Sequence, residues 1–215
     1  MVDSLASEGG CCQPMIRSGS PQSSSVRSCG IRRVGWLVCS LGLLASDPVV
    51  ERAGAADLYI GTTGTPETVT ISSGTNIYQT TSVGYSGASS NNLLVVTGSG
   101  TQLTNSLYLW VGRPEAGGNN QVLVTNGASL RSGSYTWIGD TAGNSVVVTG
   151  SGTTYANNLS GGGYFKVGSQ GNSNSFTASS GATVSVGSEA AIGYSSGSSF
   201  NLLLVTDSGT SFTSS

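Results

Sequence analysis

The stretch VGYSGASSNNLLVVTGSGTQLTN, residues 83–105, decides the fold of this chain because its pattern recurs along the sequence. A similar stretch is IGDTAGNSVVVTGSGTTYANN, residues 138–158. From about Leu58 onward, two markers alternate through roughly six imperfect units, which is the signature of a repeat architecture. The first marker, a β-branched residue followed by glycine, occurs at Ile60-Gly61, Val83-Gly84, Val111-Gly112, Ile138-Gly139, Val167-Gly168 and Ile192-Gly193. The second marker occurs at Gly74-Thr75, Gly100-Thr101, Gly127-Ala128, Gly152-Thr153, Gly181-Ala182 and Gly209-Thr210.

Between the markers, side chains alternate as they do in a strand that buries one face. Aligning the units predicts an inward aliphatic pair per coil: Val69/Ile71, Leu94/Val96, Val122/Val124, Val146/Val148, Phe176/Ala178 and Leu203/Val205. A second strand is predicted to bury Ile77, Leu103, Leu130, Tyr155, Val184 and Phe212, and a third to bury Ile60, Val83, Val111, Ile138, Val167 and Ile192. Three short strands per unit fit one coil of an all-β, single-stranded parallel β-helix, or solenoid, with coils roughly 4.8 Å apart. A β-propeller or β-sandwich is the alternative, but propeller blades need about 40 residues.

An asparagine stands two residues before the inward pair in five of the units: Asn92, Asn120, Asn144, Asn174 and Asn201. The first unit differs and has Glu67 there. Asparagines at equivalent corners can hydrogen-bond up the stack, and asparagine also tolerates the left-handed conformation that corners need. We therefore predict a structural asparagine ladder rather than a set of ligand-binding residues.

The composition excludes several kinds of site. Charged residues make up 8% of the chain and the formal net charge is −2, so no basic stripe is available for a nucleic-acid partner. The chain has no histidine, and Gly161-Gly162-Gly163 is followed by Tyr164-Phe165 rather than by the aspartate of a calcium-binding repeat. We therefore expect no metal site and no cofactor.

The N-terminal segment has the pattern of an export signal. Arg32-Arg33 precede the apolar run of residues 34–45, and the small residues Ala53 to Ala56 follow it. We predict that residues 1–56 form a disordered region containing a signal peptide, cleaved near residues 55–56, and that residues 57–215 form the repeats. The alternative is a disordered tail without an export signal. All four cysteines precede residue 40, which excludes a disulfide framework from the repeats.

Units such as residues 83–105 and 138–158 resemble the repeats of bacterial autotransporter-type passenger domains, and the resemblance covers roughly residues 58–215. It implies a right-handed parallel β-helix that is secreted or displayed on the outer-membrane cell surface, often as part of an adhesin. The translocator barrel of a complete autotransporter is absent, so we expect the repeats to be truncated at their C-terminal end. Membrane attachment would then use only parts missing from this chain.

Aromatic residues supply the candidate binding site. Trp110 and Trp137 occupy the same outward position on adjacent coils, where other coils have Tyr59 and Lys166. Two exposed indoles about 5 Å apart could form a platform for glycans or for other cell-surface proteins. The alternative is that they stack only to cover the outer face of the sheet. Tyr85 and Tyr194 could extend the same surface.

The functional prediction is a non-enzymatic extracellular rod with a structural or adhesive role, and no catalytic residues are assigned. The alternative is a carbohydrate-active β-helix enzyme, similar to a polysaccharide lyase or a glycosidase. Glycoside hydrolysis needs two carboxylates about 5–9 Å apart across one groove. Glu115 and Asp140, with Arg113 nearby, are the residues that could meet this requirement.

Overall fold

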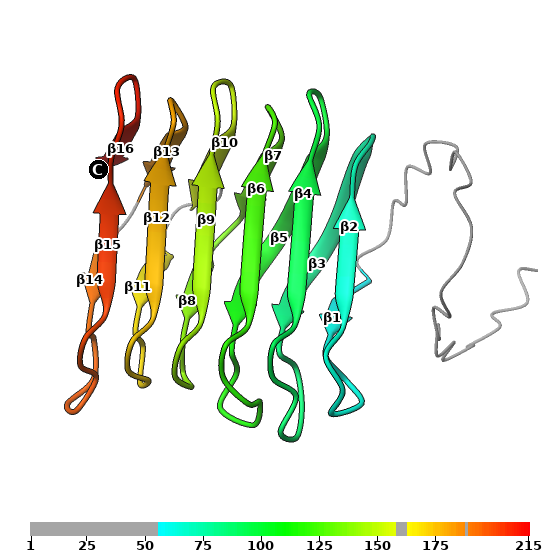
Figure 1. The fold of residues 1–215 in the computed structure, drawn as a ribbon, viewed down its shortest axis with the longest axis vertical. Coiled ribbons are helices and arrows are strands. Elements are labelled where there is room, and N and C mark those ends of the chain that lie inside the picture. Colours follow the sequence, from blue (N-terminus) through cyan, green and yellow to red (C-terminus); the bar gives the residue numbers. More distant parts are fainter. Residues whose placement is uncertain (1–55, 158–162, 188) are drawn as a thin grey trace, which may run out of the picture. The chain divides into compact units, whose positions relative to one another are not determined.

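The computed structural model describes residues 56–157, 163–187 and 189–215, which form a parallel β-solenoid of about six coils (Figure 1). The described part contains strands and turns but no helix. The predicted fold class is therefore confirmed. The predicted signal peptide falls on residues that lie outside the described ones, apart from Ala56.

One sheet takes a single strand from each coil, and its six strands lie side by side in coil order (Figure 1). All neighbours in this sheet are parallel and no register shift interrupts them. The pairing places the predicted inward pairs opposite one another, as in Val122 opposite Val146 and Val124 opposite Val148. Its strands are β2 (Thr68–Ile71), β4 (Leu93–Thr97), β6 (Gln121–Thr125), β9 (Ser145–Thr149), β12 (Ser175–Ser179) and β15 (Leu202–Val205).

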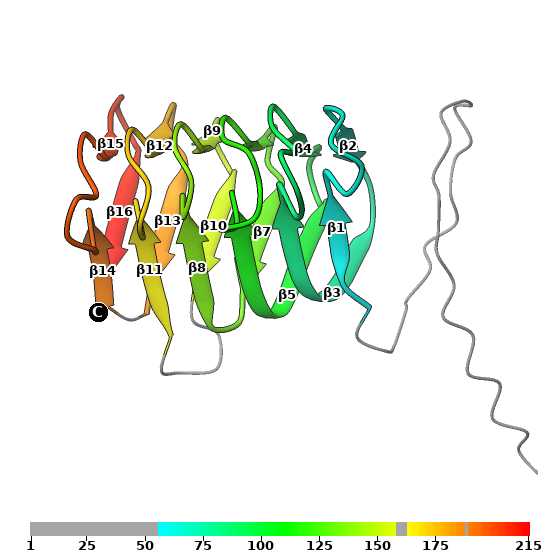
Figure 2. The same ribbon diagram turned by 90° about the horizontal axis from the view of Figure 1, so that it is seen from below.

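The second sheet has ten strands and combines the other two sides of the coil (Figure 2). Two of these strands are long and span both sides, namely β3 (Thr75–Val83) and β5 (Gln102–Val111). The prediction of three strands in every coil is therefore wrong for these two coils. The shorter strands are β1 (Leu58–Ile60), β7 (Ser129–Ser132), β8 (Tyr135–Ile138), β10 (Thr154–Asn157), β11 (Tyr164–Val167), β13 (Thr183–Val186), β14 (Glu189–Ile192) and β16 (Ser211–Ser214).

The strand breaks between β7 and β8 because of a close backbone approach at Gly133. A Cβ atom there would lie only 2.1 Å from the carbonyl oxygen of Ser106 in the coil before it. Glycine is the residue that permits such an approach and that also weakens a strand. The continuous strand β5 has Ser106-Leu107 at the corresponding point.

The interior is a continuous column of apolar side chains. Nearly all of the predicted inward residues of the four central coils are fully buried, including Leu94, Val124, Ile138 and Phe176. In the last coil, Ile192 is 47% exposed and Val205 is 42% exposed, so the prediction that Ile192 is buried is wrong. Their strands β14 and β15 each pair with a single neighbour, and one side of the coil is therefore uncovered.

Ile77 was predicted to point inward, and this is also wrong. Asn76, not Ile77, lies opposite the buried Leu103, and Ile77 is 48% exposed. The corner between β2 and β3 consists of Ser72–Gly74, whereas the corner between β4 and β5 in the next coil consists of Gly98–Thr101. Aligning the glycine markers ignores this difference in loop length, and a shift of one residue reverses the face of every side chain in a strand.

The same corner alternates between a long and a short form in later coils (Figure 1). In the long form, a threonine hydroxyl accepts a hydrogen bond from a glycine N–H of the preceding coil. Thr153 Oγ1 accepts from Gly127 N at 3.0 Å, and Thr210 Oγ1 accepts from Gly181 N at 2.9 Å. Thr101 Oγ1 is buried and has no hydrogen-bond partner among the described residues. The corner of the preceding coil, Ser72–Gly74, is shorter and brings no glycine N–H to this hydroxyl.

Candidate functional site

The five predicted ladder asparagines form a continuous chain of hydrogen bonds along one corner of the stack. The Nδ2 of each of the first four donates to the Oδ1 of the next asparagine, at 2.7, 2.9, 3.1 and 3.2 Å from Asn92 to Asn201. Each of these Oδ1 atoms also accepts the backbone N–H of the preceding asparagine. Glu67 begins the series, since its own N–H donates to Asn92 Oδ1 and its carboxylate accepts from Gly61 N at 2.7 Å. The amides are thus occupied by the fold itself.

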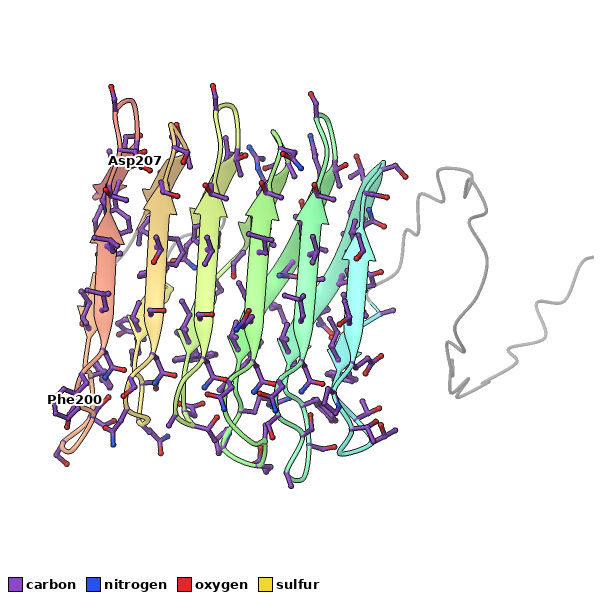
Figure 3. All side chains as sticks on the ribbon, viewed as in Figure 1. Phe200 and Asp207 are labelled. Carbon is purple, nitrogen blue, oxygen red and sulfur yellow. The ribbon has the colours of Figure 1, made fainter. Side chains whose placement is uncertain are left out.

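The ladder asparagines do not adopt the left-handed conformation, and that part of the prediction is wrong. The residue immediately before each of them does: Asn91, Asn119, Gly143, Ser173 and Phe200 have φ between 56° and 75°. The tight bend therefore precedes the residue whose side chain enters the stack. Phe200 is an unusual occupant of such a position and is 87% exposed; Figure 3 shows it at one end of β15, with Asp207 at the other.

The glycine of the first marker and the ladder asparagine of the following coil pack against each other. Gly112 has φ +75°, and a Cβ atom there would lie 2.3 Å from Asn144 Nδ2. Gly84 and Gly139 stand in the same relation to Asn120 and Asn174. The glycine of the first marker and the ladder asparagine therefore form the same corner, from two successive coils.

On the strands that lead into this corner, outward aromatic rings form a compact surface that we call the aromatic face: Tyr108, Trp110, Tyr135, Trp137 and Tyr164. Strand pairing aligns Trp110 with Trp137, and Tyr108 with Tyr135 and Tyr164 on successive coils. The Trp110 and Trp137 centroids are 4.0 Å apart, and Tyr135 stacks on Trp137 at 4.6 Å with an interplanar angle of 2°. Trp110 and Trp137 remain partly exposed.

Sequence reasoning missed the three tyrosines of the aromatic face. Each lies two residues before the predicted platform position, in Tyr108-Leu109-Trp110, Tyr135-Thr136-Trp137 and Tyr164-Phe165-Lys166. The period of two that identified the interior also places these residues on the outer face. Applying that period outward would have found them.

Two cations lie against the edges of the aromatic face. The Arg113 guanidinium carbon is 5.0 Å from the Trp110 ring centroid and 5.2 Å from that of Tyr85. Lys166 is 8% exposed, and its Nζ lies 3.2 Å from the ring centroid of Tyr194. Such contacts stabilise a cation over a ring by about 0.5–2 kcal/mol. The rings predicted to extend the surface, Tyr85 and Tyr194, thus hold its basic residues in place.

The two carboxylates considered for catalysis are near enough to influence each other. Burial raises the pKa of Asp140, and the Ser169 hydroxyl lowers it. Glu115 raises this pKa further, whereas Lys166 and Arg113 lower it. An open hollow of about 240 Å³ beside the aromatic face is lined by Tyr85, Ser86, Arg113 and Glu115. Asp140 does not line this hollow, so the two carboxylates do not face one another across it.

The described residues contain no group of three or more acidic, cysteine or histidine side chains that could hold a metal ion. Within the same part of the chain, no helix is long and apolar enough to cross a membrane. Comparisons with protein-family models, curated proteins and solved structures found no match for this chain.

Proposed function

We propose that this chain is a non-enzymatic extracellular rod of the autotransporter-passenger type, with an adhesive role carried by the aromatic face. The observation that carries the proposal is the cluster of five outward rings on three successive coils. Partly exposed aromatic clusters on a rigid scaffold are typical of binding surfaces, because tyrosine and tryptophan offer large contact areas at a low entropy cost.

The scaffold suits a structural role in display. One corner of the stack is held by side-chain amides that hydrogen-bond from coil to coil, and the interior is one apolar column. Low charge, the repeat pattern and the apolar run at residues 34–45 support secretion or display at the outer-membrane surface. Glycans and other cell-surface proteins are the proposed partners.

A carbohydrate-active enzyme is the second candidate, and the observation in its favour is Asp140. Burial and Glu115 raise the pKa of this carboxyl, as a general acid requires. The hollow argues against an enzyme, because Glu115 lines it and Asp140 does not, so the two carboxylates cannot act on one bound substrate there. Release of reducing ends from polysaccharides by the wild type, and its loss in Asp140→Asn, would support this candidate over the first.

The adhesive proposal is tested with the full chain coupled to beads. Bead retention on cell surfaces and on a glycan array is compared between the wild type and Trp110→Ala/Trp137→Ala, with Leu123→Ala on the other sheet as the matched control. We expect retention to fall at least fivefold in the double variant and to stay unchanged in the control. Equal retention of the wild type and the double variant would refute the proposal.

A further inference from the structure

We propose that the aromatic face binds a neutral, linear glycan that lies along the rod axis. The inference rests on the proposed adhesive function and names the ligand class of the same site. Three properties of the surface lead to it: the free polar tips of its rings, its local charge, and its spacing.

The first property is the chemistry that the rings leave available. The rings of the stacked pair Tyr135 and Trp137 cover one face of each other, and Trp110 packs on Trp137. Exposed edges, phenol hydroxyls and indole N–H groups then remain for a partner. Among the described residues, no hydrogen bond engages the phenol hydroxyls or the indole N–H groups of the aromatic face. None of these groups is buried without a hydrogen-bond partner. Such groups recognise ligands that carry many hydroxyl and carbonyl oxygens.

The second property is charge, which separates neutral from acidic glycans. Arg113 and Lys166 are the basic residues at this surface, and both are directed onto aromatic rings. Asp140 and Glu115 lie beside them, and Glu189 aligns with Tyr164 on the next coil. The acidic groups outnumber the basic ones, so a polyuronate or a sulfated chain would meet net repulsion.

The third property is periodicity. Tyr108, Tyr135 and Tyr164 repeat at the coil spacing of roughly 4.8 Å, so their hydroxyls span about 10 Å along the axis. A linear chain of sugars offers equivalent groups at regular intervals in the same direction. Beside Trp110, the hollow lined by Arg113 and Glu115 gives the chain a pocket with both a cation and a carboxylate. Sugar hydroxyls can donate to one and accept from the other.

The test is calorimetric titration of the full chain with cello-, manno- and chito-oligosaccharides of one to six units, with polygalacturonate as the acidic comparison. We expect affinity for at least one neutral series to rise tenfold or more from one unit to three and then to level off. Raising NaCl from 50 to 500 mM should change that affinity less than twofold. Tyr135→Ala and Tyr164→Ala should each weaken binding at least tenfold, and Leu123→Ala should leave it unchanged.

Two results overturn the inference. The first is that the wild type binds polygalacturonate but none of the neutral oligosaccharides, with strong salt dependence. The second is that the wild type binds no neutral oligosaccharide although beads coated with it still adhere. Both leave the adhesive function standing, since bead retention reports that function separately. Unequal circular dichroism spectra would show that Tyr135→Ala misfolds, and Tyr164→Ala then decides the question.

Discussion

Replacement of Asn144 by alanine tests how much the asparagine ladder contributes to the fold. Its Oδ1 accepts from both the backbone N–H and the Nδ2 of Asn120, each at 2.9 Å. Its Nδ2 donates to the Thr141 carbonyl at 2.9 Å and to Asn174 Oδ1 at 3.1 Å. After the change, Asn120 Nδ2 keeps the Gly117 carbonyl and Asn174 Oδ1 keeps the backbone N–H of residue 144. The buried Asn120 N–H loses its only acceptor among the described residues.

The one orphaned buried donor costs about 1–3 kcal/mol, and the other hydrogen bonds lost at Asn144, which leave no further buried donor unpaired, add about 1 kcal/mol together. We therefore expect the free energy of unfolding to fall by about 2–4 kcal/mol. At about 2–4 °C per kcal/mol for a domain of this size, the melting temperature should drop by about 5–15 °C.

The assay is urea unfolding combined with amide hydrogen exchange, because repeat proteins can open coil by coil. Exchange at the Asn120 amide should accelerate more than at amides of distant coils. Asn172→Ala is the matched control: this exposed side chain accepts from Ser199 N at 2.7 Å, where water can replace it, so the change should stay within about 0.5 kcal/mol. Equal effects of the two substitutions, or unchanged exchange at Asn120, would refute the reasoning.

Three further predictions use pairs of related positions or pH. Gly112→Ala should destabilise the fold by about 1–3 kcal/mol more than Gly100→Ala, because both have positive φ but only the first meets a side chain; thermal melting measures the difference. Thr153→Val should cost about 1–2 kcal/mol in urea unfolding, whereas Thr101→Val, which removes an unpaired buried hydroxyl, should be neutral or stabilising; equal losses would contradict this. Asp140→Asn should stabilise the protein at pH 7 and lose that advantage below pH 3.8, because a raised native pKa makes wild-type stability fall as the pH rises above the ordinary aspartate pKa of 3.8. A gain that is constant from about pH 3 to 7 would show another cause.

The fold was predictable because its period-two pattern repeats in several independent units. Val122/Val124 and Val146/Val148 need only local alternation and a common register, both of which are visible in the sequence. The aromatic pair Trp110 and Trp137 follows from the same register. What the pattern could not supply is the length of each corner, and Ile77 was misplaced because its corner is shorter than the next one.

Burial and corner geometry depend on neighbours rather than on local pattern. Ile192 faces the interior by register yet stays exposed, because no described strand follows it on that side. The packing of Gly112 on Asn144 joins residues from two coils that a single repeat does not contain. The spacing of the repeats placed Glu115 and Arg113 near Asp140, but it could not show the burial that raises the pKa of this carboxyl, nor the Ser169 hydroxyl that lowers it.

The central claim is that the aromatic face is a binding surface, and the indole N–H signals of the full chain test it most directly. The chain has three tryptophans, so a nitrogen–proton correlation spectrum should show three resolved indole signals. On titration with the tightest neutral oligosaccharide, we expect the signals of Trp110 and Trp137 to move together along one binding curve. Saturation of the ligand with both signals unmoved would contradict the claim.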